Sequence, residues 1–401
     1  MDTTTQHVKA DRSSGVYGES ETVVFQSDGL GGGASYTITT GKPGVPGSIV
    51  VASGQLEGSV RFAPPAPGVF RMNAGSKPDS GNDAAAAVAV APERIAPALP
   101  RPEDFNEFWA AQLRDLSSGE MEIYGAEQDG DVVTASVSLP TSSGPVSAWL
   151  HTPVGSGPWP AIIRYHGAGV YSVSRDNARE LARAGFLVLS PNAHAIENGR
   201  EPGYYKGLME GELRDYRIQG RERRESLYFI GMFLRAAALA QAVQKHPAWN
   251  GKHLFVQGHS QGGGQALAAA GLVPEVNGLA LSCPTHCDHA GPLAGRPAGW
   301  PQIADVRDGT PVASHVEAAR YIDGTNFATI IRCPAIVCVC LLDDACPPAG
   351  IYAAANQLSA GVEVLTDPLT GHIHTDAHGE AMHKWFCARA GVEPVAWEPG
   401  L

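Results

Sequence analysis

The stretch Gly-His-Ser-Gln-Gly-Gly-Gly at residues 258–264 decides how this sequence is interpreted. It follows the apolar run Leu254–Gln257 and precedes an alanine-rich segment that reaches Ala270, which predicts a strand, a tight turn and a helix. Such a turn leaves no room for side chains two residues before and two residues after the serine, and glycines occupy both positions. We expect the turn to lift the Ser260 hydroxyl above the sheet as a nucleophile.

The sequence on either side alternates between apolar strands and helices. Strands are expected at residues 132–139, 146–151, 161–165, 187–190, 279–282, 335–342 and 362–365, and helices at 101–113, 176–184, 226–245 and 261–270. Continuous apolar strands separated by helices are typical of parallel strands that are buried on both faces. We therefore predict an α/β fold with a mostly parallel central sheet and helices on both faces.

A serine hydroxyl becomes a good nucleophile when a histidine takes its proton and a carboxylate orients that histidine, and in this fold the chain order is serine, acid, histidine. Asp343 and Asp344 both follow a predicted strand, and His372 and His374 share the loop after the next strand. Asp343 is favoured because it is nearer to its strand, and His372 because Gly371 precedes it. The other acid is then a solvated or capping carboxylate, and the other histidine lines the pocket.

Two backbone amides are expected to bind the oxyanion that forms when Ser260 attacks a carbonyl group. The N–H group of Gln261 lies at the predicted helix N-terminus, directly after the serine. A second donor should come from the loop after an earlier strand, where residues 165–169 read Tyr-His-Gly-Ala-Gly. We assign this donor to the N–H group of Ala168, against the alternative of an ordinary turn between a strand and a helix.

The seven cysteines all lie between Cys283 and Cys387, and their odd number does not indicate a disulfide scaffold. Residues 283–289, Cys-Pro-Thr-His-Cys-Asp-His, are of the types that bind zinc. These potential ligands fall within seven residues directly after a predicted strand, however, and no second pair of ligands follows at the spacing of a zinc finger. We therefore predict no metal site and no cofactor.

Residues 1–98 differ in composition from the rest, being rich in Gly, Ser, Thr and Val. Short alternating runs separated by turn residues occur at 22–25, 35–39, 48–51, 59–62 and 68–72, and 84–92 reads as a last strand. This pattern predicts a small antiparallel, immunoglobulin-like β-sandwich at 1–98. The catalytic α/β domain is then expected at 99–401.

The composition excludes several classes of function. The 401 residues carry a net charge of −12, so a nucleic-acid partner is not expected. No apolar stretch approaches the roughly 20 residues that span a bilayer, so we expect no membrane partner. The first residues lack the basic and apolar layout of a secretion signal; we expect either that none existed or that it is absent from this sequence.

Several short motifs together resemble one family of α/β-hydrolases, the acetyl xylan esterases and cephalosporin C deacetylases. They are Arg-Pro-Glu-Asp-Phe at 101–105 with Phe108 and Trp109, Tyr-His-Gly at 165–167, Gly-His-Ser-Gln-Gly-Gly at 258–263, Asp343 four residues before Pro347-Pro348, Asn356, and Gly371-His372. The resemblance covers about residues 100 to 390. It implies a catalytic triad of Ser260, Asp343 and His372, oxyanion binding by Gln261 and Ala168, and cofactor-free hydrolysis of an acetyl ester.

The chain also departs from this family's pattern. The family's Arg-Gly-Gln is replaced by Pro-Asn-Ala-His at 191–194, which leads into a loop at 199–211, and the residue after the proposed catalytic histidine is Ile373 instead of Glu. The sandwich is extra to the compact family members. These differences leave the substrate open. Candidate substrate-binding residues are Tyr171, His194, Tyr204 and Tyr205.

We expect a serine esterase for small-acyl, most simply acetyl, esters of a carbohydrate or another small alcohol. Alternatives are a serine peptidase or larger-acyl esterase on the same fold, or a catalytically silent carbohydrate-binding protein. The family forms ring-like oligomers, so a homo-oligomer stays open, although the sandwich could cover the same surface. Chemistry on polysaccharides favours a secreted or periplasmic location.

Overall fold

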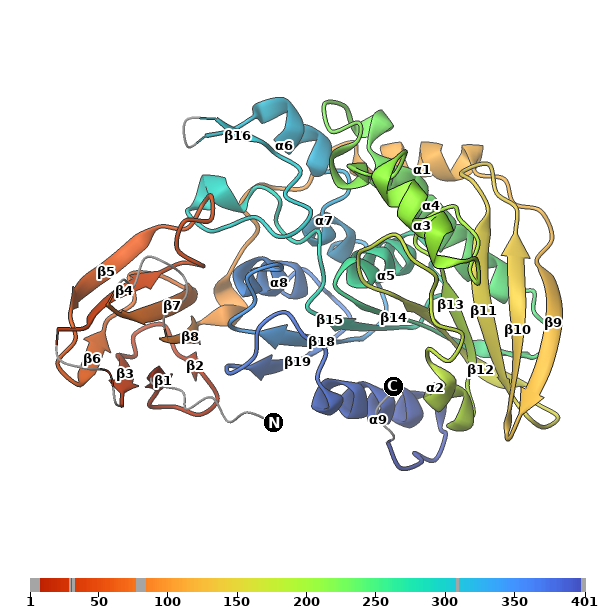
Figure 1. Cartoon of the computed structure of the whole chain (residues 1–401), viewed down its shortest axis with the longest axis horizontal. Coiled ribbons are helices and arrows are strands. Elements are labelled where there is room, and N and C mark those ends of the chain that lie inside the picture. Colours follow the sequence, from red (N-terminus) through yellow and green to blue (C-terminus); the bar gives the residue numbers. More distant parts are fainter. Residues whose placement is uncertain (1–7, 29, 31–32, 77–83, 308–309, 398–401) are drawn as a thin grey trace.

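The computed structural model describes residues 8–28, 30, 33–76, 84–307 and 310–397 (Figure 1). A large helix-covered sheet forms one part of the molecule, and smaller sheets from the N-terminal segment lie beside it. Residues 1–7, on which the expectation about a leader rests, lie outside the described part.

The central sheet has the strand order β19-β18-β15-β14-β12-β13-β11-β10-β9. Its strands are β9 (Glu122–Asp129), β10 (Val132–Leu139), β11 (Val146–Pro153), β12 (Trp159–Tyr165), β13 (Leu187–Pro191), β14 (Trp249–His259), β15 (Gly278–Ser282), β18 (Ala335–Cys340) and β19 (Val362–Asp367). Neighbouring strands among β19, β18, β15, β14, β12 and β13 pair in parallel. The strands β11, β10 and β9 continue the sheet with antiparallel pairing. The predicted mostly parallel sheet is confirmed.

Helices cover both faces of this sheet because its strands are apolar on both sides. Ile162 and Ile163 are neighbours on β12 and fully buried, yet they belong to different core clusters. The Ile163 face packs against α4 (Tyr228–Val243), α5 (Gln261–Leu272) and α8 (Pro348–Ala355). The Ile162 face packs against α2 (Arg179–Arg183) and α9 (Asp376–Ala390), which lie on the opposite side of the sheet in Figure 1.

The remaining elements refine the sequence-based expectations. They are α1 (Phe105–Asp115), α3 (Pro202–Glu210), α6 (Ala313–Ala319), α7 (Gly324–Ala328), the hairpin of β16 (Val306–Arg307) and β17 (Thr310–Pro311), and the 3-10 helices η1 (Pro92–Arg94), η2 (Tyr216–Ile218), η3 (Arg224–Ser226) and η4 (Gly291–Ala294). The prediction of a loop at 199–211 was wrong, because this segment contains α3, which has Pro202 at its first position. Strand β9 was missed because all its residues are exposed, so no apolar alternation marks it.

The N-terminal segment forms two facing sheets. One has the order β1 (Val8–Ala10), β3 (Val23–Ser27), β6 (Ser59–Phe62); the other has β2 (Val16–Tyr17), β8 (Ala84–Val90), β7 (Gly68–Gly75), β4 (Ser35–Thr39), β5 (Val50–Gln55). Phe25 and Val23 from one sheet and Ile38, Met72 and Val88 from the other are fully buried in a common core. The pairing is antiparallel except for β2 with β8, which run parallel and correct the all-antiparallel prediction.

The two parts share buried surface. Val69, Ala87 and Ala89 of the sandwich are buried in the same core cluster as α8 and the central sheet. The Asn356 side-chain amide, just after α8, donates to the carbonyl oxygens of Pro92 and Ile95 at 2.7 and 2.9 Å. The sandwich is therefore packed against α8, which follows the carboxyl end of β18 (Figure 1).

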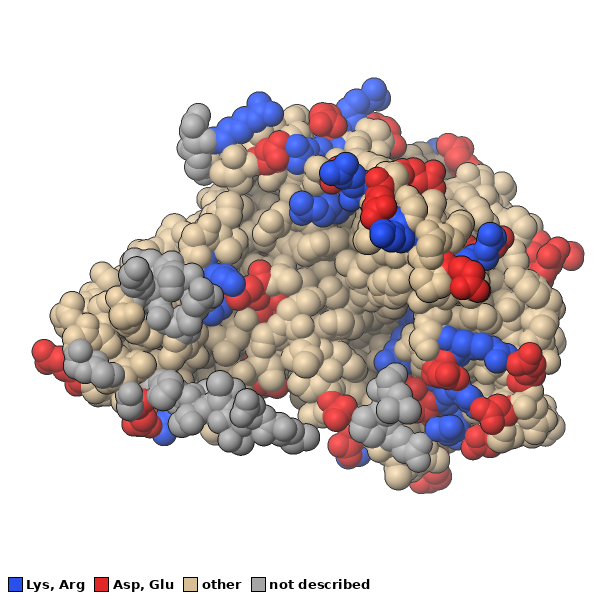
Figure 2. Space-filling model, in the orientation of Figure 1, with Lys and Arg blue, Asp and Glu red and all other residues tan. Residues whose placement is uncertain are grey.

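Charged side chains of both signs are interspersed on the face shown in Figure 2, which is hollowed between the sandwich and the helices. Among the described residues, no helix combines the length and the apolar character that crossing a bilayer requires.

Candidate active site

Ser260 lies on a strained turn between β14 and α5. Its backbone has φ 55° and ψ −124°, a conformation that costs free energy in a residue with a side chain. A Cβ atom on Gly258 would lie 2.1 Å from the carbonyl carbon of Gly262, and one on Gly262 would lie 2.2 Å from the Tyr165 carbonyl oxygen. Both positions therefore require glycine, for the reason given by the sequence pattern.

Ser260, His372 and Asp343 form a continuous hydrogen-bonded chain. Ser260 Oγ lies 2.8 Å from His372 Nε2, and His372 Nδ1 lies 2.8 Å from Asp343 Oδ2. The second carboxylate oxygen of Asp343 accepts from the backbone N–H groups of Ala345 and Cys346 at 2.9 and 2.8 Å. The loops after three parallel strands, β14, β18 and β19, supply the three side chains at one edge of the sheet.

The environment of His372 favours its protonated form. Burial lowers the pKa of His372, but the hydrogen bond and the negative charge of Asp343 raise it by more, so the pKa lies above its usual value. The Asp343 side chain is fully buried, whereas that of His372 is 27% exposed. An imidazole in this position can take a proton from Ser260 and hold it as a cation beside a fixed carboxylate.

The two competing residues have other contacts. Asp344 turns toward the sandwich, where its carboxylate pairs with Arg71 and Lys42. The ring of His374 lies between those of His259 and His378, with centroid distances of 5.9 and 6.0 Å. Burial lowers the pKa of His374 to about 3, so its ring is neutral near neutral pH.

The predicted oxyanion donors flank Ser260. Gln261 begins α5, so its N–H group points out of the helix N-terminus. Ala168 lies in the loop after β12, and a Cβ atom on neighbouring Gly167 would lie 3.7 Å from Ser260 Cβ. Neither amide donates to an acceptor in the described part of the chain. Both amides thus lack an acceptor in that part, and their role as oxyanion donors stays a prediction.

Residues 93–389 match the family model of acetyl xylan esterase (AXE1). The chain belongs to the acetyl xylan esterase family. The acetyl esterase Axe7A of Xylanibacter ruminicola is 26% identical over 308 residues, which cover 75% of this chain and 70% of that protein. The resemblance inferred from the sequence motifs is confirmed, and the chain is a carboxylic ester hydrolase.

Solved structures of esterases share this fold. Acetyl xylan esterase 1 from Thermoanaerobacterium sp. JW/SL YS485 superposes with a TM-score of 0.61 at 23% identity, covering 74% of this chain and 97% of that one. The acetyl xylan esterase from Paenibacillus sp. R4 gives 0.60 at 23% identity, covering 74% and 98%. The α/β-hydrolase fold extends over nearly the whole of both relatives, and the part of this chain beyond it is about the length of the sandwich.

Two of the four residues that were predicted to bind substrate contact the loop that carries Ala168. The buried His194 ring uses both nitrogens internally, Nδ1 at 2.7 Å from the Tyr228 hydroxyl and Nε2 at 3.1 Å from the Gly169 carbonyl oxygen. The Tyr171 hydroxyl donates to the Gly167 carbonyl oxygen at 3.1 Å. These contacts fix the backbone on both sides of Ala168.

The other two predicted residues lie on α3. The Tyr205 hydroxyl is buried and donates to the Glu197 carbonyl oxygen at 2.8 Å. The Arg200 guanidinium lies over the Tyr204 ring, with its central carbon 4.9 Å from the ring centroid. Their contribution to substrate binding stays a prediction.

Sequence reasoning missed Tyr216. It lies on η2, 45 residues before Gln261, and its hydroxyl donates to Gln261 Oε1 at 2.7 Å. The Gln261 side chain is buried, so this contact holds in place the residue that follows Ser260. No motif surrounds Tyr216, and only the folded chain brings it to the site.

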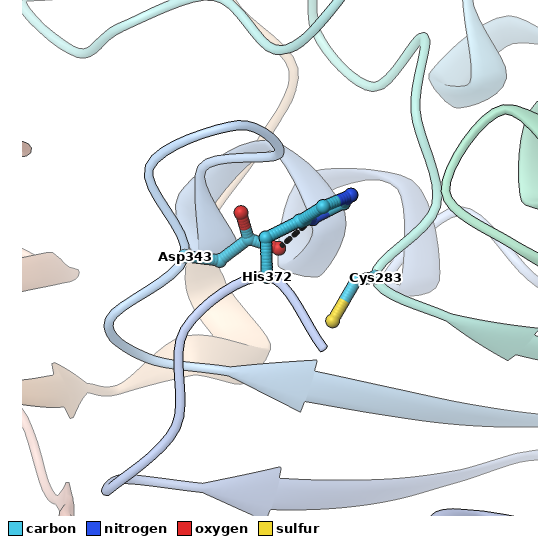
Figure 3. A group of neighbouring side chains, drawn as sticks. All are labelled: Cys283, Asp343 and His372. Carbon is cyan, nitrogen blue, oxygen red and sulfur yellow. Dashed lines mark hydrogen bonds and ion pairs between the residues drawn. The ribbon is translucent and has the colours of Figure 1, made fainter. Parts of the chain in front are cut away.

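Side chains of the cysteine and histidine motif at 283–289 have partners of their own. His286 Nδ1 contacts the Thr285 hydroxyl at 2.7 Å, and Asp288 pairs with Arg296 at 2.6 Å. Among the described residues, this motif does not form a group of potential metal ligands by itself. Cys283 lies instead beside Asp343 and His372 (Figure 3).

Proposed function

We propose that this protein removes acetyl groups from carbohydrate esters, with Ser260 as nucleophile, His372 as general base and acid, and Asp343 as the group that orients His372. The observation that carries this assignment is the pair of 2.8 Å contacts that join the three side chains. Membership of the acetyl xylan esterase family supports the acetyl group and the carbohydrate alcohol.

In the first half of the reaction, His372 Nε2 accepts the Ser260 proton while Oγ attacks the acetyl carbonyl carbon. The oxygen that becomes negative is held by the N–H groups of Gln261 and Ala168. His372 then gives its proton to the leaving sugar oxygen, the ester bond breaks, and the acetyl group stays on Ser260.

The second half repeats the chemistry with water. His372 Nε2 accepts a proton from a water molecule, and the resulting hydroxide attacks the acetyl-enzyme at the same carbonyl carbon. The negative oxygen of this second tetrahedral intermediate again accepts hydrogen bonds from the N–H groups of Gln261 and Ala168. When it collapses, acetate leaves and the proton returns from His372 to Ser260 Oγ. The buried Asp343 side chain orients His372 and stabilises each imidazolium.

We also propose that residues 1–98 are an accessory domain and 99–401 the catalytic domain. The last sandwich strand ends at Val90, and the family match begins at residue 93. The first helix of the α/β part starts at Phe105. The connecting segment between them contains only the 3-10 helix η1.

The experiment that tests the proposed reaction is hydrolysis of p-nitrophenyl esters of increasing acyl length, with Ser260→Ala in parallel. A kcat/KM that is highest for acetate and lost in the variant supports a small-acyl serine esterase. Preference for long acyl chains contradicts the acetyl assignment, and equal activity of the variant contradicts the nucleophile.

A further inference from the structure

We infer that Cys283, Asp343 and His372 form a Zn²⁺ site, and that zinc bound there switches the esterase off. The Cys283 thiol, a carboxylate oxygen of Asp343 and a ring nitrogen of His372 all lie within 4.8 Å of one another (Figure 3). This inference concerns the regulation of the proposed active site, and the inhibition rests on the proposed role of His372. Zinc binding itself does not depend on that role.

The sheet topology brings the three residues together. Strands β15, β18 and β19 are parallel neighbours, and each residue follows one of them. The Cys283 backbone N–H donates to the Cys338 carbonyl oxygen at 3.1 Å, which extends the β15–β18 ladder to the cysteine. Its sulfur lies 3.8 Å from the carbonyl oxygen of Ile373, the residue after His372.

A second thiol lies beside the first. Cys340 Sγ is 3.7 Å from the same Ile373 carbonyl oxygen, so the two thiols contact one acceptor. Both cysteines are buried and are not joined in a disulfide. Cys340 or a water molecule can complete a tetrahedral shell around an ion that is bound by the other three groups.

The donor set selects for zinc. Thiolate, imidazole and carboxylate are the ligands that Zn²⁺ combines, whereas Mg²⁺ and Ca²⁺ require oxygen donors. Two ligands of a tetrahedral zinc lie about 3.5 Å apart, so the observed separations need to change by roughly an ångström. The thiolate and the carboxylate balance the two positive charges of the ion, and the thiol proton is released to solvent.

Zinc at this position disables the base whichever ring nitrogen of His372 binds it. Coordination of Nδ1 forces the ring proton onto Nε2, which then cannot accept the Ser260 proton. Coordination of Nε2 occupies that lone pair directly. The ion can reach the site because the His372 side chain is 27% exposed, although Asp343 and Cys283 are buried.

The test is the zinc dependence of p-nitrophenyl acetate hydrolysis, with each variant normalised to its own zinc-free rate. Cys283→Ala removes the thiol, and Cys338→Ala is the matched control because Cys338 is buried on β18 but packs on the opposite face with α9. We expect the half-inhibitory zinc concentration to rise about tenfold or more in Cys283→Ala and to stay unchanged in Cys338→Ala. We expect no inhibition by Mg²⁺ or Ca²⁺, and recovery with EDTA. Equal zinc sensitivity in Cys283→Ala, or none in the wild type, overturns the site.

A second measurement keeps the site testable if Cys283→Ala does not fold, and it separates the two proposals. Co²⁺ bound by a thiolate produces a charge-transfer absorption in the near ultraviolet, which can be followed on the wild type and on Ser260→Ala. That absorption with one ion per chain supports the site even if no ester is cleaved, in which case the proposed function fails alone. Ester hydrolysis without that absorption overturns the metal site alone.

Discussion

The Arg71 guanidinium pairs with Asp344 at 2.5 Å and so connects the sandwich to the residue next to Asp343. Arg71 lies on β7 and also donates through Nε to Asn73 Oδ1 at 2.9 Å, which fixes its direction. Lys42, from the same sandwich, lies 3.3 Å from the other carboxylate oxygen of Asp344. The loop that presents the proposed catalytic acid is therefore held from outside the α/β part.

Removing this ion pair should slow catalysis. We expect Arg71→Gln to lower kcat for p-nitrophenyl acetate roughly tenfold with little change in KM, because a loosened loop misplaces Asp343 and the imidazole it orients. Arg71→Lys should retain more activity. Arg61→Gln, an exposed site on β6, is the control. A kcat equal to that of the wild type would show that the sandwich does not position the triad.

The choice between the two histidines can be tested by substitution. His372→Ala should lower kcat/KM by about 10⁴-fold, because it removes the group that accepts the Ser260 proton. His374→Ala should stay within a few fold, since His374 contacts other histidines and not Ser260. Steady-state kinetics on one acetyl ester measures both, and a reversed ranking would refute the assignment of His372.

The turn at Ser260 should not tolerate a larger residue at position 262. The added Cβ of Gly262→Ala would lie 2.2 Å from the Tyr165 carbonyl oxygen, so β12 and α5 would have to separate. We expect a marked fall in melting temperature or loss of soluble protein. Gly207→Ala on α3 is the matched control, because its Cβ meets nothing within 4 Å and alanine favours a helix by up to about 1 kcal/mol. Equal melting temperatures of the two variants would contradict the packing argument.

Tyr216 should matter through Gln261. Tyr216→Phe removes the hydroxyl that donates to Gln261 Oε1 and leaves a buried acceptor unpaired, which costs about 1 to 3 kcal/mol locally. We expect kcat to fall by about fivefold with KM nearly unchanged, since the oxyanion donor is displaced. In the control Tyr124→Phe, on the exposed strand β9, the hydroxyl that is lost has no hydrogen-bond partner among the described residues, so kinetics should be unchanged. An unaltered kcat in Tyr216→Phe would confine this residue to packing.

The sequence predicts features that depend on neighbouring residues. Gly258 and Gly262 predict the turn, because a Cβ atom at either position would collide with nearby backbone atoms. The parallel strands are predictable because burial on both faces makes them continuously apolar. Strand β9 carries no such signal, because all its side chains are exposed.

Features that depend on distant contacts could not be predicted. The position nearer to the strand favoured Asp343, but nothing in the sequence showed that Arg71, 273 positions away from Asp344, pairs with Asp344. The proximity of Cys283 to His372 likewise arises from the order of three strands in the sheet. The sequence also contained no sign that the Tyr228 hydroxyl and the Gly169 carbonyl oxygen contact both ring nitrogens of His194, whose role in substrate binding stays a prediction.

The most direct test of the central claim is acetate release from acetylated xylo-oligosaccharides by the wild type and by Ser260→Ala at equal concentration. We predict rapid release of free acetate by the wild type and a loss of about 10⁴-fold or more in the variant. Comparable release by the variant would contradict a reaction through Ser260, and no release by the folded wild type would contradict the proposed substrate.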